Sequence, residues 1–265
     1  MLKTGSRSTI LANHDSHHVE VRSLSVVAMQ IRSWVLASVV WATCPAMASA
    51  AERGFFAGLD VFAGTAEGSS STVDGGAPFA GGGVVGNVRL GKTAGAGGHV
   101  GYRLGTATSA FLSYQHIEGD IDWKVNFPMF GVSSAYEGSA TSDAIMGNLA
   151  YEFPLSEATS VRASAGLGVT FNALSGVVET DRATGIFLAN VASHRKVGPA
   201  AQIGAGIRYK VTPSVALGLE ALLAYSGKFE TGKTRSGNLG ITDINPYEIK
   251  DVWRANLGAS ISFEF

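Results

Sequence analysis

The feature that most constrains this chain is a strict alternation of apolar and polar residues at its carboxyl end. Residues 253–265 read WRANLGASISFEF, and every odd-numbered position carries an apolar side chain. A period of two over this length indicates an extended strand whose two faces meet different surroundings. Thirteen residues exceed the usual strand of a soluble sheet, but they suffice to cross a bilayer at a tilt.

The composition restricts the class of protein further. No run of residues approaches the ~18 apolar side chains of a membrane helix. The formal net charge is −1, which gives no electrostatic reason to expect nucleic acid as a partner. The 34 glycines fall within alternating runs rather than in low-complexity repeats, so we expect them inside strands.

Residues 29–50 have the organisation of a secretory signal peptide. Met29 begins a short basic region that contains Arg32, and an apolar core follows over residues 34–44. The segment ends in Ala48-Ser49-Ala50, the small-residue pattern at which such peptides are cut. We therefore expect cleavage after Ala50.

Residues 1–28 do not resemble the start of a signal peptide. We interpret them as a non-native extension that arises from a start codon assigned too early, with Met29 as the true start. His14, His17 and His18 form a possible metal cluster in this segment, but its position leads us to expect no metal site.

Cys44 raises the alternative of a lipoprotein. Thr43 and Trp41 before it fit the lipoprotein pattern poorly, so we do not adopt this interpretation. Cleavage after Ala50 removes this only cysteine, and a cysteine-free mature chain of residues 51–265 suits an oxidising periplasm.

Seven further stretches show the same alternation. The eight expected strands are residues 54–64, 98–104, 109–117, 142–153, 159–174, 199–211, 215–225 and 253–265. Long connections (65–97, 118–141, 175–198, 226–252) alternate with short ones (105–108, 154–158, 212–214), as in outer-membrane barrels. An open sheet edge is not tolerated in lipid. We therefore predict an all-β fold: an eight-stranded antiparallel up-and-down transmembrane β-barrel with periplasmic termini and four long extracellular loops.

The aromatic residues of the outward face sort by height. Those expected near the periplasmic rim are Phe55, Tyr102, Tyr151, Phe153, Tyr209, Phe263 and Phe265, and those expected near the outer rim are Phe171, Tyr225 and Trp253. Two aromatic girdles are typical of membrane barrels. The alternative, a soluble barrel with an apolar interior, would bury these residues and would not need them sorted by height.

The opposite face carries charges of both signs. They are Asp60, Glu152, Glu220 and Glu264 against Arg103, Arg162, Arg208, Lys210 and Arg254. Charges in a narrow lumen are costly unless they are paired, so this near-balance predicts a salt-bridged plug. We expect Arg103, Glu152, Arg162, Arg208 and Glu264 to cluster near the periplasmic end, with Asp60 and Glu220 deeper. A narrow ion path lined by the same groups is the alternative.

Two stretches match the phosphate-binding pattern GxxxxGK[ST], at residues 86–93 and 227–234. That pattern binds phosphate only when a strand precedes the loop and a helix follows it. Neither stretch precedes a helical sequence, so we expect no nucleotide site.

Some small outer-membrane barrels modify lipids and need a histidine with a serine and an acid. His99 is expected to point inward, and His116 lies at the top of a strand beside Glu118. Ser113 has the opposite parity to His116, so no such set forms. We expect no enzymatic activity, no catalytic residues, no metal and no cofactor.

Two apolar segments interrupt the otherwise polar connections, at residues 127–130 and 186–188. Such patches indicate contact with a host, a matrix or a neighbouring protein. The alternative is that hairpins extend above the membrane and pack on each other.

The signal peptide, the opening strand FFAGLDVFAG, the strand HVGYRLG and the terminal phenylalanine together resemble the small OmpA/OmpX-type and opacity-type barrels of the porin-like superfamily. The resemblance covers residues 51–265 and is specific for fold and location. It implies the outer membrane of a Gram-negative bacterium, with Phe263 and Phe265 as the terminal assembly signal.

The partners that this resemblance implies are outer-membrane lipid, the barrel-assembly machinery acting through the C-terminal strand, and a surface ligand bound by the loops. The expected role is structural or adhesin-like. A small diffusion channel is the alternative, and a lipid-modifying enzyme is third.

Overall fold

The computed structural model describes residues 54–71 and 82–265, and the regular structure in these ranges is all β. The strands are β1 (Phe55–Ser70), β2 (Val84–Arg103), β3 (Thr108–Phe127), β4 (Val132–Pro154), β5 (Thr159–Asp181), β6 (Phe187–Val191), β7 (His194–Thr212), β8 (Val215–Glu230), β9 (Thr234–Gly237), β10 (Gly240–Asp243) and β11 (Glu248–Glu264). No helix of the described ranges is long and apolar enough to cross a membrane. The expected extension (1–28) and signal peptide (29–50) lie outside these ranges.

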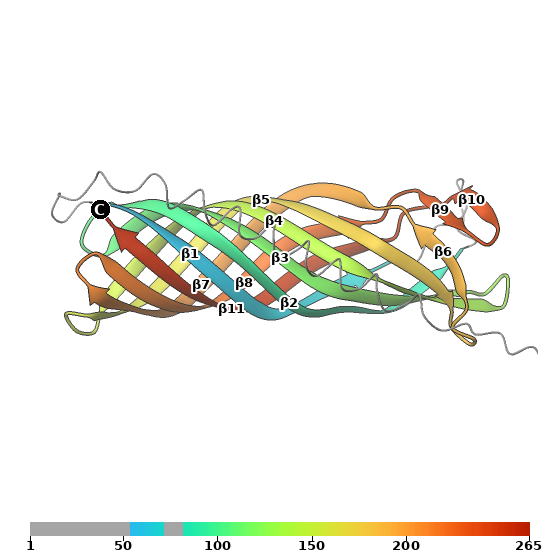
Figure 1. Ribbon diagram of the computed structural model, residues 1–265, viewed down its shortest axis with the longest axis horizontal. Helices are drawn as coiled ribbons and strands as arrows, with labels where there is room; N and C mark the ends of the chain where they lie inside the picture. Colours follow the sequence, from blue (N-terminus) through green and yellow to red (C-terminus); the bar gives the residue numbers. More distant parts are fainter. Residues whose placement is uncertain (1–53, 72–81) are drawn as a thin grey trace, which may run out of the picture. The chain divides into compact units, whose positions relative to one another are not determined.

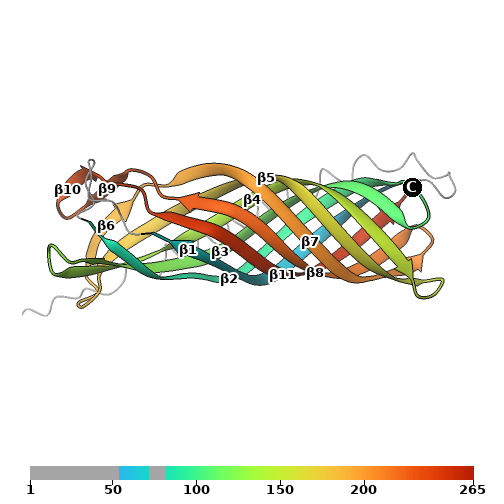
Figure 2. The same ribbon diagram turned by 180° about the vertical axis from the view of Figure 1, so that it is seen from behind.

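Eight of the strands close into an antiparallel barrel, which confirms the predicted fold. β1 pairs with β2 on one side and with the last strand, β11, on the other. The order around the wall is β1, β2, β3, β4, β5, β7, β8 and β11 (Figures 1 and 2). We call the end with the short connections and Phe265 the turn end, and the opposite end, with β6, β9 and β10, the loop end (Figure 1).

Side chains along each barrel strand point alternately out of and into the barrel. In β2, Val100 is 57% exposed whereas its neighbour His99 is 6% exposed. In β4, Leu149 is 60% exposed and Asn148 only 4%. An apolar exterior around a polar interior is the arrangement of a barrel in lipid, and it excludes the soluble alternative.

The strands run farther toward the loop end than the sequence predicted. β1 extends to Ser70 and β2 begins at Val84, well inside the connection expected at 65–97. Strand also occupies most of the connections expected at 118–141, 175–198 and 226–252. Between β3 and β4 only residues 128–131 remain as a turn.

The physical reason is that the two faces exchange their polarity partway along a strand, as β3 shows. In β3, the outward residues change from apolar Leu112 to charged Asp120 and Lys124, while the inward residues become Ile121, Trp123 and Val125. Outside the bilayer the exterior faces water and the interior no longer needs polar groups. Apolar and polar residues still alternate, but the apolar residues now point inward instead of outward. A prediction that expects apolar residues to point outward therefore ends the strand too early.

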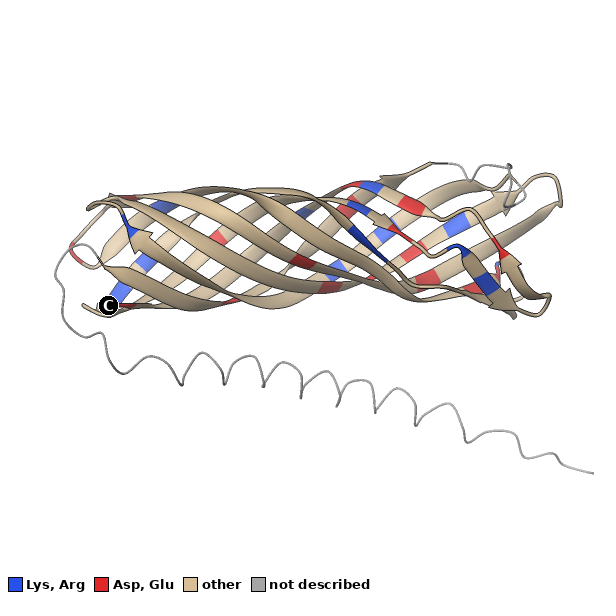
Figure 3. Cartoon of the chain, turned by 90° about the horizontal axis from the view of Figure 1, so that it is seen from above, with Lys and Arg blue, Asp and Glu red and all other residues tan. Residues whose placement is uncertain are grey.

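Charged residues follow this division. Figure 3 shows Lys, Arg, Asp and Glu frequent in the loop-end half of the barrel and sparser along the wall nearer to the turn end. The short strands β6, β9 and β10 extend the sheet there, with β6 paired to β5 and to β9.

Between β7 and β8 the ladder of backbone pairs ends before either strand does, as it also does between β1 and β2 beyond Ala66↔Leu90. The β7–β8 pairing stops at Ala201↔Tyr225, although both strands continue toward the loop end within the described ranges. Pro199 has no amide hydrogen, and Gly227 has a φ of 73°, a conformation that favours glycine. On the loop-end side of the break a backbone hydrogen bond joins the two parts of the chain again, because the Gly232 amide donates to the Ala192 carbonyl at 2.7 Å.

Side chains from the neighbouring strand hold this break. The amide of Asn172 in β5 donates to the carbonyls of Ser226 (2.5 Å) and Lys228 (3.0 Å) in β8. The hydroxyl of Thr170 donates to the Ser226 carbonyl at 3.1 Å. We refer to this stretch, residues 194–200 opposite 226–230, as the ladder break.

Candidate functional site in the barrel interior

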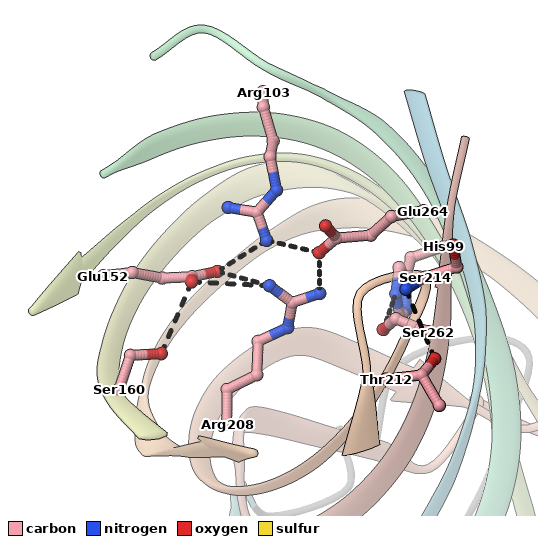
Figure 4. A network of polar contacts seen from close by, with 9 residues as sticks. All are labelled: His99, Arg103, Glu152, Ser160, Arg208, Thr212, Ser214, Ser262 and Glu264. Atoms are coloured by element: carbon pink, nitrogen blue, oxygen red, sulfur yellow. Dashed lines mark hydrogen bonds and ion pairs between the residues drawn. The ribbon is translucent and has the colours of Figure 1, made fainter. Parts of the chain in front are cut away.

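An ion-pair network crosses the turn end of the lumen. Arg103 Nη2 lies 2.6 Å from Glu264 Oε1 and 3.6 Å from Glu152 Oε1. Arg208 Nη1 lies 3.3 Å from Glu152 Oε1, and its Nη2 also donates to Glu264 (Figure 4). The four side chains come from β2, β4, β7 and β11, so the network ties opposite parts of the wall together. Each carboxylate is shared by two guanidinium groups, which compensates the charges in a confined space.

A histidine and an aspartate form the next layer. His99 Nδ1 lies 2.9 Å from Asp60 Oδ2, and its Nε2 lies 3.0 Å from Ser262 Oγ. Figure 4 shows His99 and Ser262 beside the ion-pair network. A Cβ atom at Gly58 would lie 2.5 Å from the His99 ring, so glycine is needed there to admit the imidazole.

The middle of the lumen contains a cavity of about 40 Å³, lined among others by Asp60, Arg162 and Glu220. The guanidinium of Arg162 lies 4.7 Å from the centroid of the Phe111 ring, and Ser164 donates to Glu220 at 2.5 Å. A cavity of this size has room for only one or a few water molecules.

A chain of amide hydrogen bonds crosses the same region. Gln115 Nε2 donates to Gln202 Oε1 at 3.0 Å, and Gln202 Nε2 donates to Asn148 Oδ1 at 2.6 Å. Asn148 Nδ2 then donates to Ser113 Oγ at 2.9 Å. These bonds link β3, β4 and β7 through the lumen, so the amide side chains in the middle of the barrel satisfy one another.

An apolar core fills the loop end. Trp123 and Tyr136 stack with ring centroids 5.2 Å apart, and Tyr247 packs against both. The hydroxyls of Tyr136 and Tyr247 are 2.8 Å apart. Burial raises the pKa of both phenols above its ordinary value, so both stay protonated and able to hydrogen-bond. The further members of this core are Ile121, Val125, Ala140, Leu174, Val177, Val191, Phe229, Ile244, Ile249 and Val252.

The structure thus places the charged residues expected in the interior in different surroundings. Arg103, Glu152, Arg208 and Glu264 form the network, whereas Arg162 lies over Phe111. Asp60 and Glu220 line the deeper cavity, and Arg254 is 3% exposed. Lys210 does not lie in the interior. It is exposed at the turn end, where the β7–β8 register shifts between Lys210 and Thr212 and the wall ends.

The expected girdle residues lie on the outside. Phe55 and Tyr102 contact at 5.0 Å between ring centroids, Tyr151 and Phe153 at 4.6 Å, and Tyr225 and Trp253 at 5.2 Å. Phe171 carries the guanidinium of Arg195 at 5.1 Å, and Tyr209 is half exposed. Phe263 and the terminal Phe265 are partly exposed at the turn end.

The two phosphate-binding patterns do not form phosphate loops. Residues 86–93 lie within β2, and residues 227–234 run from β8 into β9, so no helix follows either of them. His116 is held by two carboxylates, with Asp143 Oδ1 2.7 Å from Nδ1 and Glu118 Oε1 3.1 Å from Nε2. Both ring nitrogens are therefore engaged, and neither is free to take a proton from a serine. In the described ranges, no three His, Cys, Asp or Glu side chains gather as a possible metal site.

Sequence reasoning missed two parts of this interior, the pairing of His99 with Asp60 and the aromatic core of Trp123, Tyr136 and Tyr247. The first has no signal in the sequence beyond the inward parity of both residues. The second had a signal, because the inward parity of β3 continues unbroken from Ile117 to Val125.

No curated protein matches the sequence. Among solved structures, OprG from Pseudomonas aeruginosa has 14% identity and a TM-score of 0.48, covering 80% of this chain and 96% of its own. Neisserial surface protein A has 15% identity and a TM-score of 0.44, with coverage of 80% and 97%. The attachment invasion locus protein Ail of Yersinia pestis has 11% identity and a TM-score of 0.37, with coverage of 81% and 98%.

These structural similarities concern the fold alone. The family model for the outer membrane protein beta-barrel domain matches residues 34–263. The match spans most of the chain and includes every barrel strand except the last residue of β11. The chain therefore belongs to the outer membrane protein β-barrel family.

Proposed function

We propose that this protein is a non-enzymatic outer-membrane barrel with a sealed lumen, which acts through contacts made at its loop end. The observation that carries the proposal is the aromatic and aliphatic core around Trp123, which fills the barrel above the polar lumen. This core blocks a water path and at the same time makes the loop end a rigid platform.

The platform carries exposed apolar residues on three neighbouring tips. Met129 (78% exposed) and Phe130 lie on the β3–β4 tip, Ile186 on the β5–β6 tip, and Leu239 (82% exposed) on the β9–β10 tip. Backbone hydrogen bonds join the first two tips, since the Arg182 amide donates to the Ser133 carbonyl at 3.0 Å. The Asn238 amide joins the last two through the Phe187 carbonyl at 2.8 Å. The hairpins thus pack on each other, and their apolar tips remain exposed and available for contact with another surface.

The location in a Gram-negative outer membrane, export through a cleaved signal peptide, a periplasmic turn end and recognition of the C-terminal strand by the assembly machinery belong to the same proposal. Family membership and the apolar outer wall support them. We propose that the tips contact an apolar surface of a host, a matrix or a neighbouring protein.

Adhesion of cells to hexadecane tests this proposal. We expect cells that display the protein to partition into the hydrocarbon more than cells that lack it, and the variant Met129→Ser/Phe130→Ser/Leu239→Ser to lose this gain. The matched control is Leu155→Ser, because Leu155 is 67% exposed but lies at the turn end. Equal adhesion of the triple variant and the wild type, at equal surface amounts, would contradict a contact role for the tips.

A further inference from the structure

Arg254 stands apart from the other charges of the interior. It is buried at 3% exposure in the wall strand β11, and its Nε and Nη1 have no hydrogen-bond partner among the described residues. The remaining inward arginines have a carboxylate or an aromatic face beside them, although the Nε of Arg162 also lacks a partner among the described residues. A buried guanidinium without a counter-charge is strongly unfavourable, so its retention calls for an anion.

The surroundings of Arg254 supply hydrogen-bond donors. On the neighbouring strand, Arg254 is opposite Ala224, which places the inward Ser226 at the diagonal position. Ser226 is fully buried, and its hydroxyl has no partner within the described part of the chain. Asn256, the next inward residue of β11, accepts from Thr93 at 3.2 Å and leaves its amide Nδ2 as a further donor.

Carboxylates are remote from this layer. The inward acids Asp60 and Glu220 are opposite Ser260 and Gly258, farther toward the turn end along β11. In the other direction the next inward residue is Val252, which belongs to the apolar core. The layer around Arg254 is thus rich in hydrogen-bond donors, carries a positive charge and lies next to the apolar core of the loop end.

Access to this layer does not require opening either end of the barrel. Ser226 lies at the edge of the ladder break, where side chains of β5 contact β8 and no backbone pairs join β7 to β8. Lys196 and Glu230 span the same break with an ion pair of 2.8 Å. Separating the strands here breaks no ladder pairs, because the β7–β8 pairing ends at Ala201↔Tyr225.

We propose that Arg254 and Ser226 form an internal anion site reached through the ladder break. One guanidinium suits a single negative charge, which is either a free halide or the carboxylate of a single-chain amphiphile whose tail lies along the barrel wall. The two sources share the same chemistry at Arg254 and differ in whether an apolar tail contributes.

Bromide crystallography of the folded protein tests the site directly. Crystals grown in maltoside are soaked in sodium bromide, and we expect an anomalous peak within hydrogen-bonding reach of the Arg254 guanidinium. The Arg254→Gln variant should lose this peak. A peak that is spread over surface lysines and missing at Arg254 identifies an adventitious ion only and argues against a halide.

Thermal unfolding in solution distinguishes the two anions. Heat-modifiable gel mobility gives the midpoint temperature of unfolding, first in a buffer that contains gluconate. The gluconate is then replaced at equal ionic strength by bromide, or by decanoate below its micellar concentration. We expect a saturable rise of the midpoint by a few degrees in the wild type, since a ligand that binds only the folded state stabilises it. A rise with decanoate alone assigns the site to an amphiphile.

Variants separate binding from general salt effects. Arg162→Gln is the matched control, because Arg162 is also an inward arginine with an unpartnered Nε but its guanidinium lies over the Phe111 ring, and it should keep the full anion response. Arg254→Lys retains a charge and should respond more weakly, which covers the case that Arg254→Gln fails to fold. The proposal is overturned if neither anion stabilises the wild type more than the Arg254 variants.

Discussion

At the scale of residues, the interior is defined by how each charge is compensated. Arg103 and Arg208 share two carboxylates, whereas Asp60 faces His99 and Arg162 covers an aromatic ring. Parity in the sequence predicted which of the charged side chains face inward, because a strand has only two faces, and it failed for Lys210, where the wall ends. It could not predict the pairs, since those depend on strand tilt and side-chain reach across the lumen.

The ion-pair network makes a prediction about Glu152. Replacing it by glutamine leaves Arg208 with Glu264 alone, which is already shared with Arg103. Because the group is buried, we expect a loss of about 3 kcal/mol in the free energy of unfolding. Urea unfolding in lipid vesicles, followed by tryptophan fluorescence, measures this loss.

The control for this experiment is Lys210→Gln at the exposed turn end, which should change the free energy by no more than about 0.5 kcal/mol. Replacing both Glu152 and Arg208 by methionine should recover much of the stability, since no unpaired charge then remains. A Glu152→Gln barrel as stable as the control would mean that the network contributes little.

At the scale of elements, the strands are continuous across two environments. Their lower parts could be predicted from the sequence because lipid imposes an apolar exterior over the whole membrane-spanning length. Their upper parts could not be recognised as long as the apolar residues were assumed to point outward. In β3 the apolar residues change from the outward to the inward face near Ile117. The extra strands β6, β9 and β10 are short and depend on contacts distant in sequence, which no local pattern encodes.

The loop-end core makes a prediction about this upper part. Trp123 is fully buried between strands, and Trp123→Ala should cost about 3–5 kcal/mol through lost burial and a cavity. We expect the loss to be confined to the loop end, because the membrane-spanning part has its own polar core and its lipid contacts. Limited proteolysis should therefore cut the tips of the variant while heat-modifiable mobility remains.

Leu239→Ala is the control for this prediction, because Leu239 lies on an exposed tip and supports no packing. Unfolding of the entire barrel by Trp123→Ala would show instead that the loop end and the membrane-spanning part form one cooperative unit.

At the scale of the whole barrel, the interior contains three layers of side chains, which on the proposed function close it at three levels. An ion-pair network lies at the turn end, a polar core with a cavity of about 40 Å³ lies in the middle, and an apolar core fills the loop end. An eight-stranded barrel is narrow enough for side chains to fill it in this way. The sequence predicted the polar closure, but the apolar closure emerged only once the upper strands were in place.

The most direct test of a sealed lumen is the single-channel conductance of the folded protein in a planar bilayer. Heat-modifiable mobility first verifies that the barrel has folded. Closure at three levels predicts no steady conductance steps, for the wild type and for Leu239→Ala alike. Reproducible steps of constant size from the verified wild-type barrel would contradict the sealed lumen and favour a diffusion channel.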